Sequence, residues 1–386
     1  MISSNENNRS RETMAGLSCS LERLDDVKTV SVQWKELEER SDCSFFLSWD
    51  WIGTWLATAP GSAPLLLSVR DSGTVVALAI FHTAKLRRRF MPSRAMILNR
   101  TGDPHNDIIN IEYNNILTDR RYSESIWPVV ITFLKRAEIP ACPFRKWDEL
   151  HVAMATQEIA QFAHDAELMV LELAHKPSWF VDLDAVRREG KPYLDTLSSN
   201  ARYQIRRAIR LYEKEGPILG ARAQSLGQAM AYFAELKELH QTYWTHRGMP
   251  GGFSNQYFES FHRTLMQNCI ERGTVEIFRV SAGERLIGQV YNFIYRGRVY
   301  AYQTGFSYED DPKAKPGLVS HYLCMQQHLE EGALAYDFMA GDNRYKQTFG
   351  IRGPDMAHYV FQRRTATRVT EAILRRVKNL ARPGAG

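Results

Sequence analysis

The chain has 386 residues, of which 44% are hydrophobic and 11% aromatic, and a formal net charge of +5. Such a length and composition can fill the cores of about two or three domains. The mild positive charge suits anionic ligands without requiring nucleic acid. No apolar run approaches the roughly 18 residues that a membrane-spanning helix needs, which argues against a membrane-spanning protein.

Residues 1–18 are polar and lack the apolar centre of a secretory signal. We therefore expect a disordered tail here and a cytoplasmic protein. Residues 19–176 are expected to form a first α/β lobe. Within it, residues 45–56 have the spacing of an amphipathic helix, and two apolar runs on either side of residues 71–73 indicate a β-hairpin.

The five cysteines are scattered along the chain, without C-x-x-C spacing or recognisable histidine partners. They are Cys19, Cys43, Cys142, Cys269 and Cys324. The sequence therefore predicts neither a metal site nor a disulfide framework. No Ser-His-Asp set occurs at a recognisable spacing either, which argues against a hydrolase.

A second lobe is expected over residues 177–365, and it opens with a helix that shows Arg202, Arg206 and Arg210 on one face. Ser198 or Ser199 can cap this helix. Guanidinium groups pair well with phosphates and carboxylates, which makes Arg206 a candidate substrate-binding residue. A solvated basic face is the alternative.

The next helix, expected over residues 226–244, carries His240 among apolar residues. This histidine is a candidate catalytic base, and a hydrogen-bonded core histidine is the alternative. Trp244 ends the helix, and a glycine-rich loop containing Arg247 follows it. Because glycine lets a ligand approach the backbone closely, Trp244 and Arg247 are candidate substrate-binding residues.

Strands and a helix then alternate. The strand-like runs are residues 275–280, 286–295, 298–306 and 336–339, and a loop at 311–317 and a helix at 318–331 precede the last of them. Free N–H groups at a helix start attract a diphosphate, and Gly317 lets it lie against the main chain. An ordinary loop with proline in the first helical turn is the alternative. The candidate cofactor-binding residues at this helix start are Lys313, Lys315, Pro316, Gly317, Leu318, Val319 and Ser320.

The stretch from residue 336 to residue 350 carries a resemblance. Its pattern Y-D-F, G-D, Y-K, F-G resembles the closing motif of the BioF2-like or CelD-like acetyltransferase domain, a branch of the GNAT superfamily. The segment Y-K-Q-T-F-G at residues 345–350 is similar to the F-K-x-x-F motif of the Fem peptidyltransferases, which have two GNAT-like lobes. The resemblance implies an α/β protein with two GNAT-like lobes, each a mixed, mainly antiparallel sheet flanked by helices.

The resemblance also implies a direct acyl transfer from acetyl-CoA or another acyl-CoA, with no metal. The usual GNAT signature Q/R-x-x-G-x-G/A keeps only Gly317 here, so an acyl carrier protein or aminoacyl-tRNA stays open as donor. Direct attack on a thioester needs orientation, proton removal and a polarised carbonyl. Asp337 is the candidate base, with an ion pair as its alternative role.

Five further residues are candidates around the reaction centre. Tyr302 or Tyr300 can protonate the leaving thiolate, and aromatic packing is the alternative for each. The Fem resemblance implies that Lys346 neutralises a donor or acceptor phosphate. The substrate-binding candidates here are Tyr300, Gln303 and Tyr345.

We therefore expect an N- or O-acyltransferase that acts on an amine or hydroxyl of a sugar, polysaccharide or other envelope precursor. A Fem-like aminoacyl-tRNA-dependent transferase and a non-catalytic ligand-binding module are the alternatives. Residues 366–386 are expected to form a basic helix and tail, which can rest on anionic lipid or dock on the protein. The sequence leaves the oligomeric state open.

Overall fold

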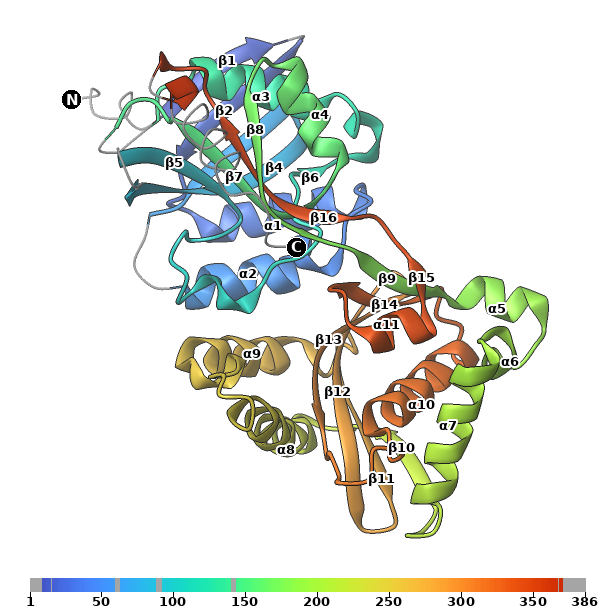
Figure 1. Cartoon of the computed structure of the whole chain (residues 1–386). Coiled ribbons are helices and arrows are strands. Elements are labelled where there is room, and N and C mark those ends of the chain that lie inside the picture. The colour runs from blue at the N-terminus through green and yellow to red at the C-terminus, as the bar shows by residue number, and fades with distance from the viewer. Residues whose placement is uncertain are drawn as a thin grey trace.

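The computed structural model describes residues 9–14, 16–59, 63–87, 92–139, 144–366 and 368–370. Figure 1 shows two lobes, each with helices packed on a sheet. Both sheets are mixed and mostly antiparallel, which confirms the predicted fold class. No helix within these ranges is long and apolar enough to cross a membrane.

Within the described residues, the sheet of the first lobe has the order β1-β2-β3-β4-β5-β7-β16-β8, with β6 beside β4. The strands are β1 (Arg9–Met14), β2 (Leu17–Arg23), β3 (Leu65–Asp71), β4 (Thr74–Arg87), β5 (Pro92–Leu98), β6 (Leu117–Thr118), β7 (Glu149–Thr156), β8 (Met169–Lys176) and β16 (Met356–Gln362). The helices are α1 (Val27–Glu39), α2 (Trp49–Thr58), α3 (Ile126–Arg136) and α4 (Glu158–Asp165). Because strand side chains alternate between faces, Leu65 and Leu67 pack with α3 and α4, whereas Leu66 packs with α1 and α2.

The sheet of the second lobe has the order β10-β11-β12-β13-β14-β9-β15. Its strands are β9 (Ser178–Asp182), β10 (Ile218–Arg222), β11 (Val275–Ala282), β12 (Arg285–Tyr295), β13 (Arg298–Phe306), β14 (Ala335–Ala340) and β15 (Ile351–Arg352). The helices are α5 (Leu183–Glu189), α6 (Tyr193–Thr196), α7 (Ser199–Tyr212), α8 (Leu226–Thr245), α9 (Gln256–Cys269), α10 (Pro316–Glu330) and α11 (Arg344–Phe349). Helices α8 and α9 lie on one face of the sheet and α7 and α10 on the other (Figure 1).

Local sequence signals set several of these boundaries. Ser198 caps α7 as predicted, because its hydroxyl accepts a hydrogen bond from the amide of Ala201 at 3.2 Å. Arg296 and Gly297 both adopt positive φ, which fits the two-residue turn between β12 and β13. Gly332, with φ of 91°, follows the end of α10.

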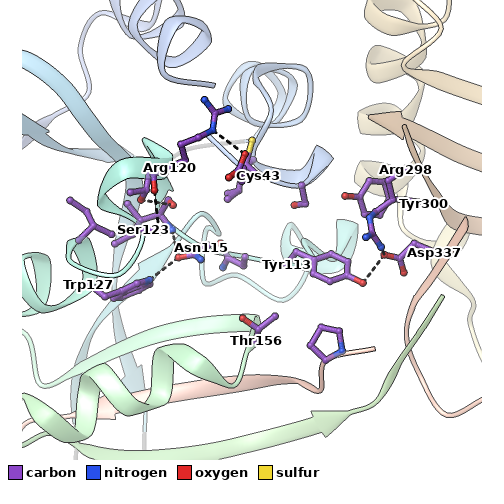
Figure 2. Close-up of a pocket in the computed structure, with 18 of the residues that line it drawn as sticks. Cys43, Tyr113, Asn115, Arg120, Ser123, Trp127, Thr156, Arg298, Tyr300 and Asp337 are labelled. Atoms are coloured by element: carbon purple, nitrogen blue, oxygen red, sulfur yellow. Dashed lines mark hydrogen bonds and ion pairs between the residues drawn. The ribbon is translucent and has the colours of Figure 1, made fainter. Parts of the chain in front are cut away.

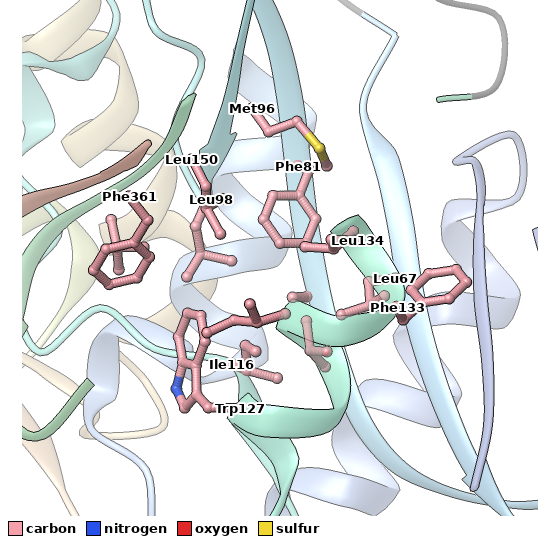
Figure 3. Packing of buried hydrophobic residues seen from close by; sticks show 14 of the residues in the cluster. Leu67, Phe81, Met96, Leu98, Ile116, Trp127, Phe133, Leu134, Leu150 and Phe361 are labelled. Carbon is pink, nitrogen blue, oxygen red and sulfur yellow. The ribbon is translucent and has the colours of Figure 1, made fainter. Parts of the chain in front are cut away.

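The last strand of the chain lies in the first lobe, not in the second lobe where we expected it. Strand β16 pairs with both β7 and β8, and Phe361 belongs to the first-lobe core beside Leu98, Leu150 and Trp127 (Figure 3). A short apolar strand carries no signal of which sheet it joins, since any unpaired edge of suitable register can accept it. The chain therefore crosses between the lobes twice, from β8 to β9 and from β15 to β16.

The tail expected at residues 1–18 is wrong for its second half. Residues 9–14 form β1, whose backbone pairs antiparallel with β2 from Arg9 opposite Glu22 to Met14 opposite Leu17. Backbone hydrogen bonds do not depend on side-chain polarity, so a polar segment can form an edge strand. The basic helix expected over residues 366–386 lies almost wholly outside the described residues, apart from 366 and 368–370.

A common hydrophobic core joins the two lobes. Phe45 and Phe46 precede α2 in the first lobe, and the Phe45 ring stacks on Phe293 of β12 with centroids 4.5 Å apart. Trp51 of α2 packs edge-on against Phe261 of α9 at 4.9 Å. Since all five side chains are buried, the lobes share apolar surface that neither can cover alone.

We expect Phe45→Ala to destabilise the whole protein by about 3–5 kcal/mol, because removal of the buried ring creates a cavity in this common core. Val32→Ala, at a side chain that is 57% exposed, serves as the control and should change stability by less than about 0.5 kcal/mol. Urea unfolding followed by tryptophan fluorescence and far-UV circular dichroism measures both. Separate transitions, with only one shifted, would contradict a common core.

Candidate active site

The strands β13 and β14 pair over only three residue pairs and then separate. The parallel ladder runs from Arg298 opposite Ala335 to Tyr300 opposite Asp337. Beyond it, residues 301–306 of β13 and 338–340 of β14 line the two sides of a cleft of about 610 Å³. The two strands thus leave backbone polar groups facing the cleft.

Lys346 satisfies the carbonyl groups that β14 no longer pairs with β13. Its ammonium group lies 2.6 Å from the carbonyl oxygen of Phe338 and 2.7 Å from that of Ala340. The side chain is buried, and burial lowers the pKa of Lys346, although the nearby carboxylate of Glu112 raises it. The role of Lys346 as a phosphate ligand stays a prediction. In the structure its ammonium group donates hydrogen bonds to carbonyl oxygens at the end of β14.

Two carboxylates satisfy the amide groups of the same segment. Asp337 accepts a hydrogen bond from the amide of Met339 at 2.7 Å, and Glu112 accepts one from the amide of Ala340 at 2.9 Å. Met339 has φ of 58°, a left-handed conformation that is unusual for a residue other than glycine. Backbone strain of this kind clusters at functional sites, and here it accompanies a bulge in β14.

The start of helix α10 opens into the cleft. Lys315 occupies the N-cap position, no side chain caps the helix, and its first turn contains no acidic residue. Lys315, Gly317 and Leu318 line the cleft. A side chain on Gly317 would place its Cβ 3.1 Å from the ring of Phe306, so the close packing there suits glycine. The helix start therefore offers free N–H groups and a positive dipole end to an anion in the cleft.

Glu112 reaches the cleft from the first lobe. It lies on the loop between Asp107 and Leu117, where Asn110 and Tyr113 adopt positive φ. The hydroxyl of Tyr302 donates a hydrogen bond to the carbonyl oxygen of Ile109, which fastens this loop to β13. The candidate site is thus built from both lobes.

Burial raises the pKa of Glu112 from 4.5 to about 7, against the opposing effects of the Ala340 amide and the Lys346 ammonium. A carboxyl group with a pKa near 7 is matched to proton transfer at neutral pH. Sequence reasoning missed this residue. The only local signal is a single acid in the mostly apolar run of residues 108–113.

Asp337, our predicted base, faces a different cavity. It lines a pocket of about 490 Å³ between the lobes, where the Tyr113 hydroxyl donates to it at 2.8 Å and Arg298 pairs with it at 3.0 Å (Figure 2). Burial raises its pKa, and Arg298 opposes that shift. Three hydrogen-bond donors hold the Asp337 carboxylate outside the cleft between β13 and β14, which favours the ion-pair alternative for this residue.

His240 and the two candidate tyrosines lie in different surroundings. Both ring nitrogens of His240 are engaged, Nδ1 with the Thr304 carbonyl and Nε2 with the Gly252 amide, each at 3.3 Å, and burial lowers its pKa. Tyr302 lines the cleft, whereas Tyr300 lines the pocket between the lobes. A bulge at Tyr302 shifts the register of β13, which strict alternation along the strand could not predict.

The structure brings together in the cleft about half of the residues we predicted. They are Trp244, His240, Tyr302, Gln303, Lys315, Pro316, Gly317, Leu318, Tyr345 and Lys346. Val319 and Ser320 are buried beneath the helix start. Lys313 is exposed outside the cleft, Arg247 stacks on Tyr243 at 3.7 Å, and Arg206 pairs with Asp195 at 3.2 Å.

Comparisons with known proteins agree with this geometry. Residues 199–347 match an acetyltransferase (GNAT) domain. The chain is similar to the crystal structure of FemX, with a TM-score of 0.57 and 12% identity over 91% of this chain and 99% of that one. It is also similar to L-PGS from Bacillus licheniformis, with a TM-score of 0.50 and 15% identity over 91% of this chain and 96% of that one. At these identities the likeness shows the fold alone, and no curated protein matches the sequence significantly. The chain thus has a GNAT-type fold, and residues 199–347 of its second lobe match a GNAT domain.

We expect Glu112→Gln to stabilise the protein more at pH 8 than at pH 4.5. Because the folded pKa lies above the ordinary value, the folded protein binds the Glu112 proton more tightly than the unfolded chain does. The contribution of Glu112 to the stability of the wild type therefore falls as pH rises from about 4.5 to about 7, a loss that glutamine avoids while still accepting from the Ala340 amide. Thermal denaturation at both pH values measures the difference, with the exposed Glu124→Gln as control. An equal difference in melting temperature between Glu112→Gln and the wild type at both pH values would contradict the raised pKa of Glu112.

Proposed function

We propose that the protein transfers an acyl group from an acyl thioester to an amine or hydroxyl by direct attack. The observation that carries the proposal is the uncapped start of α10 opening into the cleft between the separated strands β13 and β14. An acyl-CoA such as acetyl-CoA fits both features. Its diphosphate meets the helix start, and its pantetheine arm lies along the unpaired side of β13, where amide groups can exchange hydrogen bonds.

The residues of the cleft supply the remaining chemistry in this proposal. Lys315 adds positive charge beside the diphosphate. Glu112 takes the proton of the attacking amine or hydroxyl, which forms the new bond to the thioester carbonyl carbon as the thiolate leaves. Of the two candidate tyrosines, only Tyr302 lines the cleft, and we assign to it the return of a proton to the thiolate.

The acceptor side of the cleft is aromatic. Tyr243 and Tyr308 stack with ring centroids 4.9 Å apart, and Trp244 lies beside them on α8. Aromatic faces of this kind suit a sugar ring. Together with the BioF2-like resemblance, they support a saccharide or other envelope precursor as the acceptor, in a reaction we place in the cytoplasm.

We expect Lys315→Glu to raise the KM for acetyl-CoA about tenfold, equivalent to ~1.4 kcal/mol, with a smaller change in kcat. The reason is repulsion between the new carboxylate and the donor diphosphate. Lys313→Glu is the matched control, because Lys313 lies two residues away on the same loop but outside the cleft. Steady-state kinetics with a thiol-reactive dye measures both.

Equal effects of the two lysine variants would place the diphosphate elsewhere. If acetyl-CoA neither binds nor turns over, the acyl-CoA proposal is wrong. Transfer from aminoacyl-tRNA would then favour the Fem-like alternative, and binding of acetyl-CoA without turnover across sugars and amines would favour a ligand-binding module.

We expect Glu112→Gln to lower kcat/KM by about 10²–10⁴-fold, because it removes the base. Wild-type kcat/KM should rise with pH and level off above a pKa of about 7, and the variant should lose this rise. Asp337→Asn should keep it, because Asp337 lies outside the cleft. If the rise of kcat/KM with pH were lost in Asp337→Asn and kept in Glu112→Gln, Asp337 and not Glu112 would be the base.

A further inference from the structure

A cluster of metal-ligating side chains lies beneath α10, on the side of the helix that packs against the sheet. Cys324 and His328 are four residues apart on α10 and therefore share one face of the helix. Glu276 of β11 and Asn292 of β12 lie directly opposite each other in the antiparallel ladder. All four side chains are buried, with at most 4% of their surface exposed. Two neighbouring strands and a later helix thus converge on one point.

The cluster has dimensions close to those of a metal site. The ligand atoms of Glu276, Cys324 and His328 all lie within 4.8 Å of one another. His328 Nε2 is 3.0 Å from Glu276 Oε1, and Asn292 Nδ2 is 2.8 Å from the same oxygen and 3.2 Å from Cys324 Sγ. The ligand atoms around a tetrahedral Zn²⁺ are about 3.3–3.6 Å apart, given bonds of about 2.0–2.3 Å. The separations of the ligand atoms run from 3.0 Å up to at most 4.8 Å and thus bracket these values, so adjustment of the side chains would admit the ion.

Asn292 is the fourth polar side chain of the cluster, and one of its two amide atoms lacks a partner within the described part of the chain. Its side-chain oxygen is buried and has no hydrogen-bond partner among the described residues, while its side-chain nitrogen approaches both the carboxylate and the sulfur. The two amide atoms can exchange places by rotation of the side chain. The oxygen would then point at Glu276 Oε1 and Cys324 Sγ, an arrangement that a cation between them would stabilise.

The charges around the cluster also balance with a divalent ion. A Cys324 thiolate and the Glu276 carboxylate together neutralise an M²⁺ ion, with His328 neutral. Glu276 uses its other oxygen to pair with Arg222 at 3.1 Å, and Arg222 in turn pairs with Glu331. An overall neutral site avoids the cost of an uncompensated charge in the core.

We propose that Glu276, Cys324, His328 and Asn292 bind one divalent metal ion, with Zn²⁺ as the best match to a thiolate and imidazole set. On binding, Cys324 gives up its proton and its sulfur bonds to the metal. The ion would hold α10 against β11 and β12 about two turns from the helix start in the cleft. The sequence predicted no metal site, because only Cys324 and His328 are close to each other along the chain and the other two ligands come from strands.

Titration of the purified full-length protein with Co²⁺ tests this site, because Co²⁺ substitutes for Zn²⁺ and reports thiolate ligation by an ultraviolet charge-transfer band. We expect the band to saturate at one equivalent and to be displaced by Zn²⁺. Cys324→Ala should abolish it, and Cys269→Ala, which removes a buried thiol of α9 outside the cluster, should leave it unchanged.

X-ray absorption of the zinc-loaded wild type keeps the test valid if Cys324→Ala fails to fold. One sulfur at about 2.3 Å, with nitrogen or oxygen ligands at about 2.0 Å, is expected. A wild type that takes up no stoichiometric metal would overturn the proposal and leave a His328–Glu276 ion pair in its place. A band that persists in Cys324→Ala, or a shell without sulfur, would equally overturn it.

Discussion

The separation of β13 and β14 after three paired residues is the constraint on which the rest of the site depends. A sheet that opens leaves backbone groups without partners, and this chain satisfies those of β14 with three charged side chains. Lys346 donates hydrogen bonds to the carbonyl groups, and Asp337 and Glu112 accept hydrogen bonds from the amide groups. Charged groups replace the missing ladder, which places a carboxylate and an ammonium where a donor thioester would lie.

These charges come from both lobes, so the lobes form one functional unit. Glu112 and Tyr113 extend from the first lobe into the second, and the stacked pair Phe45 and Phe293 joins their cores. Burying such charges is costly, and strongly shifted pKa values tend to cluster at functional sites. The raised pKa of Glu112 follows from that burial, and it is the property that a base acting at neutral pH requires.

The sequence predicted the features that local chemistry sets. Strand and helix periods, a cap at Ser198 or Ser199 and the glycine at the start of α10 are short-range signals, and Ser198 and Gly317 lie where these signals put them. The helix expected over residues 45–56 instead starts at Trp49, after a separate 3-10 turn at Phe45–Leu47. The sequence could not show that β16 crosses back to the first sheet or that Asp337 turns away from the cleft, because strand pairing and a bulge decide both. Glu112 was missed because a base contributed by the other lobe has no fixed spacing from the donor motif.

The most direct measurement is a crystal structure with a non-hydrolysable thioether analogue of acetyl-CoA. We predict the diphosphate at the amides of Gly317 and Leu318, the pantetheine arm between β13 and β14, and the acyl carbon within reach of an acceptor atom held by Glu112. An analogue bound away from the start of α10, or a cleft that stays empty at saturating analogue, would contradict the account.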